Sequence, residues 1–449
     1  MKRFMAALLV CITLVAAAPA SAAENATQTE SRPGDFDLKT AVQRGLDANP
    51  TIMAVRSELL GSEKGIKSAR GDFLAKASVN YGFTYTSNPT TASTGGYAQD
   101  WNTWALNLNL SQPIFEGFKI LSSFQKAKLQ RDQAVAKLFY TELSLILNIQ
   151  SNFMGLLKAR MDVKSSEDSV KRLQSQLKVT QAFFDVGLRP RLDLLQAEVN
   201  LANEEQNLLK AKNQVDLQVT QLNALLNLPL EQTTPYVGQL EYMPFEKDFD
   251  TCLKIAYQNR PDIQMAQKSM EIATKDADIS AGDFYPHVSA DFNYNQVGDD
   301  PTLAKSRALS ESQENYWTAG ATVSWTFFEW GSNYYDYQKA LDAVEQLRHE
   351  MDNTKLEAGN EVKSNLLNIA TAAERIRVAR KSVEAGQEGY RMAVARYQAQ
   401  VGTNTEVLDA QSDLTDAEAL LNEALADYQT ALANLYVSMG VKNIGLQID

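Results

Sequence analysis

Apolar residues return every seven positions in two long stretches of this 449-residue chain. In the first stretch they are Ile149, Leu156, Val163, Val170, Leu177 and Phe184, and in the second they are Val362, Ile369, Ile376, Val383, Tyr390 and Tyr397. Each residue of the first set lies as many positions before its counterpart in the second set as Ile149 lies before Val362. We call this separation along the sequence the repeat interval. A strict seven-residue period indicates helices that supercoil left-handedly, because about 3.5 residues per turn keep one stripe facing the neighbouring helix. The sequence therefore predicts a long coiled structure built from two copies of one unit.

Both stretches belong to longer helices without proline, roughly residues 118–186 and 332–401. A turn and a return helix follow each of them. The return helices carry matched heptads: Leu194, Leu201, Leu208, Val215 and Leu222, then Val407, Leu414, Leu421, Tyr428 and Leu435. Shorter helices are predicted near 52–73 and 263–284. At about 1.5 Å per residue, a short helix and a return helix placed end to end match one long helix, so we expect each pair to lie along its long helix.

Two pairs of strands with alternating side chains separate the short helices from the long ones. One face holds Tyr81, Phe83, Tyr85, Trp104, Leu106, Leu108, Leu110, Val288, Ala290, Phe292, Tyr294, Trp317, Ala319, Ala321, Val323 and Trp325. The other face is small and uncharged apart from Asp291, and all five tryptophans lie at or just beyond the ends of the second strands. Such strands could cover half of a soluble sheet, but apolar strands with aromatic ends favour the wall of a membrane β-barrel.

Four strands are too few to close a barrel, since the smallest membrane barrels have about eight. The wall must therefore be shared among copies of the chain. A dimer would supply eight strands and a trimer twelve, and the residues alone leave both open. The predicted fold class is mainly α with a membrane β-barrel, built from two internal repeats with four strands per chain.

The beginning of the chain has the charge, length and small-residue end of a secretory signal peptide, which we place at residues 1–23. The mature chain would keep only Cys252, so an exported protein without an internal disulfide is expected. No later apolar run is long enough for a membrane-spanning helix. The net charge of −12 becomes −14 without Lys2 and Arg3, which argues against a nucleic-acid partner.

Patterns typical of catalysis or metal binding are absent from the sequence. The only histidines are His287 and His349, and one mature cysteine does not complete a His/Cys metal cluster. No nucleophile elbow, zinc-protease helix or phosphate-binding glycine loop is present. We therefore predict a protein that is not an enzyme and that uses neither a cofactor nor a metal.

The chain resembles the TolC family of outer-membrane efflux and secretion ducts over essentially its whole mature length. The resemblance rests on the internal repeat and on short motifs: Asn49-Pro50, Arg260-Pro261, Gln112-Pro113-Ile114-Phe115-Glu116-Gly117, Phe284-Tyr285-Pro286 and the two turns that end the long helices. It implies a homotrimer with a twelve-stranded barrel in the outer membrane of a Gram-negative cell, continuous with a helical tunnel into the periplasm. It also implies a periplasmic adaptor (membrane fusion) protein and an inner-membrane pump, proton-driven or of the ABC type, besides outer-membrane lipid.

The repeat divides the chain into five parts. These are the signal peptide 1–23, a first structural repeat 24–228 (helix, two strands, long helix, return helix), a linker or equatorial segment 229–248, a second structural repeat 249–440 and a C-terminal tail 441–449. The linker and the tail are expected to form a small belt around the tube.

The turns that end the long helices are the predicted contact surface for the adaptor. They are Val186, Gly187 and Leu188 in the first repeat and Val401, Gly402 and Thr403 in the second. Gly187 and Gly402 would let the backbone reverse between antiparallel helices. An ordinary helical-hairpin turn is the simpler interpretation of the same residues.

Charged residues just after the turns are the predicted gate of the periplasmic entrance. Glu406 and Asp409 are three residues apart, so they share one face of the return helix. Glu406 also completes a capping-box motif and needs no further role, whereas Asp409 lies past the cap. The resemblance implies acidic rings at these positions, which with Asp193 in the first repeat would attract cations. Arg189 and Arg191 are candidates to tether the closed state to nearby acids.

The leading functional hypothesis is a passive exit duct of a tripartite efflux pump, conducting small toxic compounds from the pump to the exterior. The outer-membrane component of a type I protein secretion system fits the same features, because the pump selects the cargo. A structural coiled-coil surface protein would explain the heptads but not the apolar-out strands. A free-standing porin conflicts with the helical majority of the chain.

Overall fold

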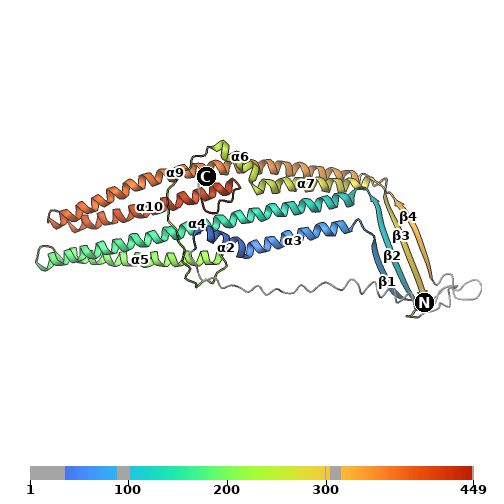
Figure 1. Ribbon diagram of the computed structural model, residues 1–449, viewed down its shortest axis with the longest axis horizontal. Coiled ribbons are helices and arrows are strands. Elements are labelled where there is room, and N and C mark those ends of the chain that lie inside the picture. Colours follow the sequence, from blue (N-terminus) through green and yellow to red (C-terminus); the bar gives the residue numbers. More distant parts are fainter. Residues whose placement is uncertain (1–35, 88–101, 299, 304–314, 447–449) are drawn as a thin grey trace, which may run out of the picture. The chain divides into compact units, whose positions relative to one another are not determined.

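The computed structural model describes residues 36–87, 102–298, 300–303 and 315–446 (Figure 1). The predicted signal peptide, the polar residues after it, the middle of each loop between paired strands and the last three residues lie outside these ranges. The linker and most of the tail lie within them.

The two halves of the described chain repeat the same order of elements. The first half contains α2 (Leu38–Ala48), α3 (Pro50–Gly71), β1 (Lys76–Tyr85), β2 (Asn102–Glu116), α4 (Lys119–Asp185) and α5 (Arg191–Leu225). The second contains α6 (Phe249–Asn259), α7 (Pro261–Ala281), the short turn η1 (Gly282–Phe284), β3 (His287–Gly298), β4 (Asn315–Ser324), α9 (Ser332–Gln398) and α10 (Asn404–Ser438). Both ends of α9 follow the ends of α4 by the repeat interval, and both ends of α10 follow those of α5 in the same way. The predicted internal repeat is confirmed.

The two long helices, of 67 residues each, form the axis of the helical part. Helix α4 packs against α3 on the side of the sheet and against α5 beyond it, and α9 packs against α7 and α10 in the same way (Figure 1). The expected end-to-end placement of the shorter helices is therefore confirmed. Helix α4 also contacts α7 and α10, which joins the repeats into one layer. Among the described residues, no helix combines the length and the hydropathy that crossing a membrane requires.

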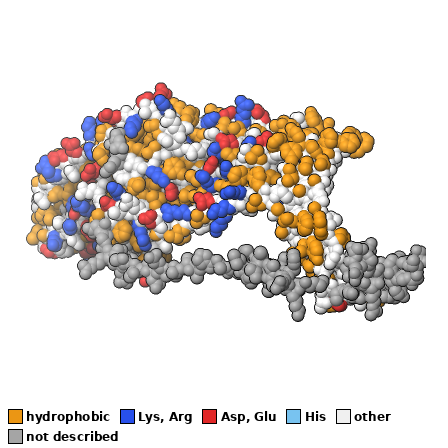
Figure 2. Space-filling model, turned by 45° about the vertical axis from the view of Figure 1, so that its right-hand side comes forward, with side chains coloured by type: hydrophobic (Ala, Val, Ile, Leu, Met, Phe, Trp, Pro, Cys, Tyr) orange, Lys and Arg blue, Asp and Glu red, His pale blue; other side chains and the backbone are white. Residues whose placement is uncertain are grey.

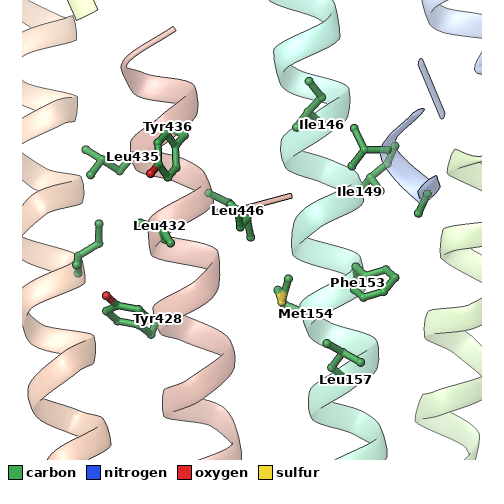
Figure 3. Packing of buried hydrophobic residues seen from close by; sticks show 14 of the residues in the cluster. Ile146, Ile149, Phe153, Met154, Leu157, Tyr428, Leu432, Leu435, Tyr436 and Leu446 are labelled. Carbon is green, nitrogen blue, oxygen red and sulfur yellow. The ribbon is translucent and has the colours of Figure 1, made fainter. Parts of the chain in front are cut away.

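The largest apolar core lies where the middle of α4 meets the end of α10 (Figure 3). Ile149 and Phe153 of α4 and Leu432 of α10 are almost fully buried, together with Ala41 of α2 and Cys252 of α6. These residues come from both repeats, so their burial removes apolar surface from water only when the repeats are joined. The heptad residues of the sequence thus form the core that fixes one repeat against the other.

The linker and the tail pack on this same level of the long helices. The hydroxyl of Tyr428 donates to the carbonyl of Met243 at 2.5 Å, and Gln150 Nε2 donates to the carbonyl of Asn443 at 2.6 Å. Tyr236 forms a parallel bridge with Phe36, which precedes α2. Both segments therefore lie against the middle of the helices, where a belt was expected.

The four strands form one antiparallel sheet in the order β1-β2-β3-β4. Its register places the apolar residues on one face: Leu108 stands between Val79 and Tyr294, and Tyr294 is opposite Trp317. In Figure 2 the hydrophobic side chains gather over the strands and the adjoining helix ends, whereas Lys, Arg, Asp and Glu lie over the helices. The predicted alternation of apolar and polar strand faces is confirmed.

The polar face of the sheet carries hydrogen-bonded side-chain pairs. Asn109 Nδ2 donates to Asn293 Oδ1 at 2.7 Å, and Ser111 Oγ donates to Asp291 Oδ1 at 2.6 Å. Because each pair joins β2 to β3, the pairs cross the boundary between the two repeats. Strands β1 and β4 are the two edges of this sheet.

The end of α10 is fastened to the corner between α6 and α7. Arg260, at this corner, donates from Nη1 to the carbonyl of Ser438 at 2.9 Å and forms an ion pair with Glu361 at 2.6 Å. Gly440 follows with φ +70°, and a Cβ atom at this position would lie 2.7 Å from the carbonyl carbon of Asn259. Only glycine permits both the dihedral angle and the approach.

We predict that Gly440→Ala lowers the free energy of unfolding by about 1–3 kcal/mol, because the new Cβ strains the backbone and displaces the α6–α7 corner. Gly61→Ala in α3, where a Cβ would meet no atom within 4 Å, should be neutral or stabilising by about 0.5–1 kcal/mol. Thermal unfolding in detergent, followed by circular dichroism, compares the two. Equal midpoints for both variants would contradict the prediction.

Candidate functional site at the hairpin ends

The turn between α4 and α5 is closed by backbone hydrogen bonds and leaves its tip exposed. The N–H of Gly187 donates to the carbonyl of Phe184 at 2.9 Å, and the N–H of Leu188 donates to that of Phe183 at 2.8 Å. Gly187 has φ +76°, the left-handed conformation that ends many helices. The side chain of Val186 is 69% exposed. The expected reversal at Gly187 is confirmed.

The turn between α9 and α10 is built differently from the one expected. The left-handed residue is Gln400, with φ +61°, which is the counterpart of Gly187 by the repeat interval. Gly402 is buried, and a Cβ there would lie 3.1 Å from both Arg396 Cβ and Glu406 Oε2. The prediction that Gly402 reverses the chain is therefore wrong. A side chain at this position would need Arg396 or Glu406 to shift by a few tenths of an ångström.

The start of α10 forms only half of the predicted capping box. Oγ1 of Thr403 accepts the N–H of Glu406 at 3.2 Å, which caps the helix. The Glu406 carboxylate turns instead toward Arg396, 3.6 Å from its Nε atom. Asp409 is exposed and forms no ion pair within the described residues, and Val401 is 69% exposed at the tip.

The two turns contact each other through Arg189. Its Nη2 atom donates to the carbonyl of Gly402 at 2.5 Å, and its guanidinium lies 4.9 Å from the ring centroid of Tyr397. Within the described ranges neither Arg189 nor Arg191 forms an ion pair inside the single chain, where Arg189 contacts a carbonyl and an aromatic ring. A tether from these arginines to acids stays a prediction. Asp193 lies in the first turn of α5, as its position in the sequence indicates.

A buried polar cluster behind the tips was missed by the sequence interpretation. Asn404 is 1% exposed; its Oδ1 accepts from Gln176 Nε2 at 2.9 Å, and its Nδ2 donates to the backbone carbonyl of Asp193 at 3.1 Å. The Tyr397 hydroxyl donates to Thr180 Oγ1 at 3.1 Å. These bonds join α4, α5, α9 and α10 at one point, so the tips of one chain are held together by a shared polar network.

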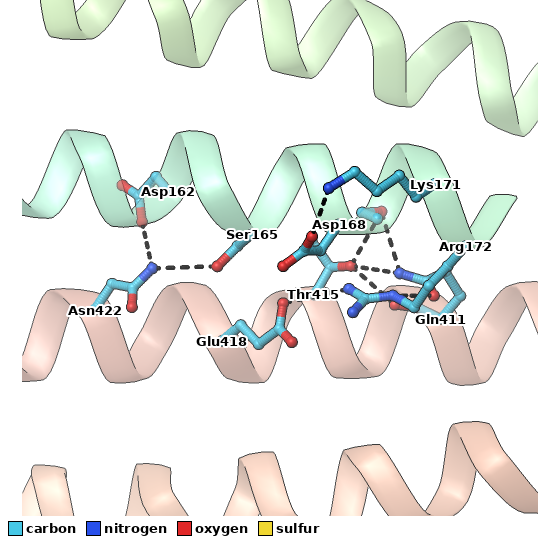
Figure 4. A network of polar contacts seen from close by, with 10 residues as sticks. Asp162, Ser165, Asp168, Lys171, Arg172, Gln411, Thr415, Glu418 and Asn422 are labelled. Atoms are coloured by element: carbon cyan, nitrogen blue, oxygen red, sulfur yellow. Dashed lines mark hydrogen bonds and ion pairs between the residues drawn. The ribbon is translucent and has the colours of Figure 1, made fainter. Parts of the chain in front are cut away.

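The network continues along the seam between α4 and α10 (Figure 4). Arg172 donates from Nε to Gln411 Oε1 at 2.8 Å and pairs through Nη2 with Glu418 at 3.3 Å. Further from the tips, Asn422 Nδ2 donates to Asp162 Oδ1 at 2.9 Å. We call this row of contacts, from Asn404 and Gln176 to Asn422 and Asp162, the polar seam.

Arg172 also faces the ring of Tyr390, with its guanidinium carbon 6.0 Å from the centroid. Burial raises the pKa of the Tyr390 hydroxyl, and the positive charge of Arg172 only partly offsets this effect. Tyr390 therefore stays uncharged beside the seam at physiological pH.

The polar seam could have been found from the spacing of polar residues. Polar side chains repeat every seven positions at Asp162, Ser169 and Gln176 and again at Asn404, Gln411 and Glu418. When helices that pack through such residues separate, water replaces the hydrogen bonds between them. The net free-energy cost is about 0.5–1.5 kcal/mol for each bond. Over the same stretch α4 and α10 also bury apolar residues such as Val170 and Leu414, whose exposure would cost about 25 cal/mol per Å².

No group of three or more His, Cys, Asp or Glu side chains in the described part of the chain is placed to hold a metal ion. The exposed side of α10 nevertheless collects acids, because Asp413 and Asp416 follow Asp409 at helical spacing. Neither forms an ion pair within the described residues. The arrangement can attract cations electrostatically, without built coordination.

Comparison with known sequences finds one family on both halves of the chain. A model described as "Outer membrane efflux protein" matches residues 41–228 and 252–441. The alkaline protease secretion protein AprF of Pseudomonas aeruginosa is 23% identical over 375 residues, which are 81% of this chain and 76% of AprF. The toluene efflux pump outer membrane protein TtgC of Pseudomonas putida is 25% identical over 307 residues, 67% of this chain and 61% of TtgC.

Solved structures share the fold at lower identity. The outer membrane protein VceC of Vibrio cholerae superposes with a TM-score of 0.76 at 16% identity, covering 90% of this chain and 96% of VceC. The CmeC outer membrane channel of Campylobacter jejuni gives a TM-score of 0.75 at 18% identity, covering 91% of this chain and 86% of CmeC.

We predict that Asn404→Ala loosens the tips, because it removes the hydrogen bonds of Asn404 with Gln176 and with the carbonyl of Asp193, at a cost of about 0.5–1.5 kcal/mol for each bond. Amide hydrogen exchange in the α9–α10 turn should accelerate by about tenfold or more. Asn203→Ala, at an exposed position of α5, is the matched control and should leave exchange unchanged. Equal exchange in both variants would show that the network does not hold the tips.

Proposed function

Because the chain belongs to the outer membrane efflux protein family, we propose that it is the exit duct of a tripartite efflux pump, through which small toxic compounds pass without a catalytic step. The family consists of channels of the Gram-negative outer membrane and not of enzymes. The observation that carries the proposal is the family match to both repeats. Each repeat supplies two strands at one end and a helical hairpin with an exposed tip at the other.

The duct would be a homotrimer with a twelve-stranded barrel in the outer membrane. Strands β1 and β4 are the edges of the sheet, and pairing β4 of one copy with β1 of the next would close the wall. The apolar strand face would then meet lipid, and the polar face with Asn109, Asn293 and Asp291 would line the lumen. In this arrangement the linker 229–248 and the tail 441–449 form the belt, and the repeats 24–228 and 249–440 form the wall.

The exposed tips would be the contact surface for a periplasmic adaptor, which in turn would engage an inner-membrane pump. Val186 and Val401 are both 69% exposed, and Leu188 is exposed beside them. Apolar groups of this size at the ends of two hairpins are suited to bind a partner helix or hairpin. Pump partners are implied by the family, whereas the type of pump is part of the proposal.

Protein secretion is the second candidate function. The match to AprF, which is named as a secretion protein, extends over more of both chains than the match to TtgC. Nothing in a duct lined by small polar and acidic groups would exclude an unfolded polypeptide. The pump with which the chain assembles would decide between the two cargoes.

The entrance gate would consist of Glu406 and Asp409, with Asp193 in the first repeat. Three copies would place six carboxylates of the second repeat around one axis. Asp413 would add a further acid along α10, away from the tip. Like charges in a constriction attract cations and repel anions. Arg189 would keep the tips closed through Gly402 rather than through an acid.

To test the assignment, the chain is expressed in a Gram-negative strain without its own exit duct, together with an adaptor and a pump of a tripartite efflux system. Resistance to toxic compounds should rise. Val186→Asp/Val401→Asp should abolish the gain while trimers persist in the outer membrane, because charge is placed in the apolar tip contact. The control Leu230→Asp, at an exposed apolar residue of the linker, should retain the gain in resistance. Export of a protease by an ABC pump without any gain in resistance would instead establish secretion.

The gate predicts cation selectivity of single channels in planar bilayers. Glu406→Gln/Asp409→Asn should lower the selectivity and weaken block by multivalent cations, because it removes six charges from a trimer. Glu388→Gln is the control, since its carboxylate is already paired with Arg391 on the exposed face of α9. Selectivity and block that stay unchanged in the double variant would leave Glu406 with no role beyond the start of α10.

A further inference from the structure

The linker 229–248 crosses the layer of long helices between the end of α5 and the start of α6 (Figure 1). Side chains of α4 and α10 hold it there by donating hydrogen bonds to its backbone carbonyls. The donors to the first part of the crossing come from α4, and the donors to the second part come from α10. The linker therefore has two anchors, one on each repeat.

The first anchor is on α4. Arg160 donates from Nη1 to the carbonyl of Tyr236. The ring of Tyr236 is buried against Phe153 of the same helix, with the ring centroids 6.0 Å apart. The Tyr236 hydroxyl donates to Asn223 Oδ1, on α5, at 2.8 Å. This end of the crossing is thus fixed to the first repeat.

The second anchor is on α10. Gln429 Nε2 donates to the carbonyl of Glu241, and the Tyr428 hydroxyl donates to the carbonyl of Met243 at 2.5 Å. The ring centroid of Tyr428 lies 4.9 Å from that of Tyr242. Both donor residues are buried. This end of the crossing is thus fixed to the second repeat.

The chain between the anchors is short. Tyr236 and Glu241 are five residues apart, and five residues reach about 18 Å at most when fully extended. The axes of two packed helices are already about 8–10 Å apart. The crossing also passes close to α4, because a Cβ on Gly238 would lie 3.1 Å from Phe153 Cε1. While both anchors hold, the linker limits how far α4 and α10 can separate at this level.

The tail crosses the same two helices in the opposite direction. It continues from α10, and Gln150 of α4 donates from Nε2 to the carbonyl of Asn443 at 2.6 Å. Leu446, 4% exposed, then lies between α10 and α4 (Figure 3). The linker and the tail line one groove of about 540 Å³ together with Phe153 and Met154 of α4. Both crossings therefore lie on one face of the helix pair.

Both crossings lie near the end of the polar seam that is farther from the tips. Arg160 precedes Asp162 by two residues, and Asp162 accepts from Asn422 in the last pair of the seam. We infer that residues 236–243 act as a strap across α4 and α10, which limits the separation of the α4–α5 hairpin from the α9–α10 hairpin. The strap goes beyond the proposed function, because it is a property of the single chain whatever passes through the duct.

Cutting the strap in the folded protein tests the inference. The recognition sequence of a site-specific protease is inserted after Gly238, between the anchors, or after Glu246, beyond the second anchor. Both positions are exposed. Either cut breaks the covalent connection between the repeats, but only the cut after Gly238 separates the anchor on α4 from the anchor on α10. The second protein is therefore a matched control for the first.

The separation of the helices is measured through Ser169→Cys, introduced into both proteins. Ser169 is 1% exposed in the polar seam, where its Oγ accepts from Gln411 Nε2 at 3.1 Å. Native Cys252 is fully buried and does not compete. The cut after Gly238 should speed labelling by a maleimide about tenfold, because the hydrogen bonds of the two anchors no longer oppose separation. The cut after Glu246 should leave the labelling rate unchanged.

A pair of variants without cleavage decides the question if the cut protein unfolds. Tyr428→Phe/Gln429→Ala removes both hydrogen bonds of the second anchor and keeps the aromatic ring beside Tyr242, so labelling should again be faster. Asn434→Ala is the matched control, because Asn434 Nδ2 donates to the carbonyl of Thr430 within α10. It should leave the labelling rate unchanged.

The outcomes separate the strap from the duct. Equal labelling after the two cuts overturns the strap, because the position of the break then has no effect, and so does equal labelling of the uncleaved variant and its control. Single-channel conductance of the uncut protein reports on the duct independently. Faster labelling after the cut at Gly238 alone, in a protein that forms no channel, supports the strap and contradicts the proposed function.

Discussion

The apolar contact between the middle of α4 and the last turns of α10 is the interaction on which the rest of the structure depends. Phe153, Leu432 and their neighbours come from both repeats, and α2, α6, the linker and the tail are all packed on the same level. Two sequence-distant halves are thereby fixed in one position relative to each other. The sheet at one end and the hairpin tips at the other follow from that position, because long unbroken helices connect both to this core.

Outside this apolar core, polar side chains join the two repeats. On the sheet, Asn109 with Asn293 and Ser111 with Asp291 join the repeats through one face while the other face stays apolar. Along the polar seam, Arg172 and Asn404 hold the tips through bonds that water can replace. The same two repeats are therefore joined by a mainly apolar core in the middle and by a core with many hydrogen-bonded side chains toward the tips.

Much of this architecture could be predicted from the sequence because it depends on periodicity. The heptads predicted the long helices within three residues at each end, and the alternation of strand residues predicted the two faces of the sheet. The tips resisted prediction for a local reason. Gln400 adopts a left-handed conformation that its residue type does not indicate, and Gly402 lies in a tightly packed place without a positive φ. Buried Asn404 was missed because polar residues in a helix are normally assigned to the surface.

Helix α4 is unbroken and passes through the apolar core, so a tilt of the helix at the core would displace its two ends. On the sheet side its arm is braced against α7 by Lys126 with Asp276 and by Gln133 with Ser269, at 2.5 and 2.7 Å. On the tip side about 28 residues, or roughly 40 Å, extend beyond Leu157. A tilt of about 10° at the core would move the end of that arm by roughly 7 Å, which is more than half of a helix diameter. A change in side-chain volume near Phe153 that tilted α4 would therefore produce a larger displacement at the tip than at the core itself.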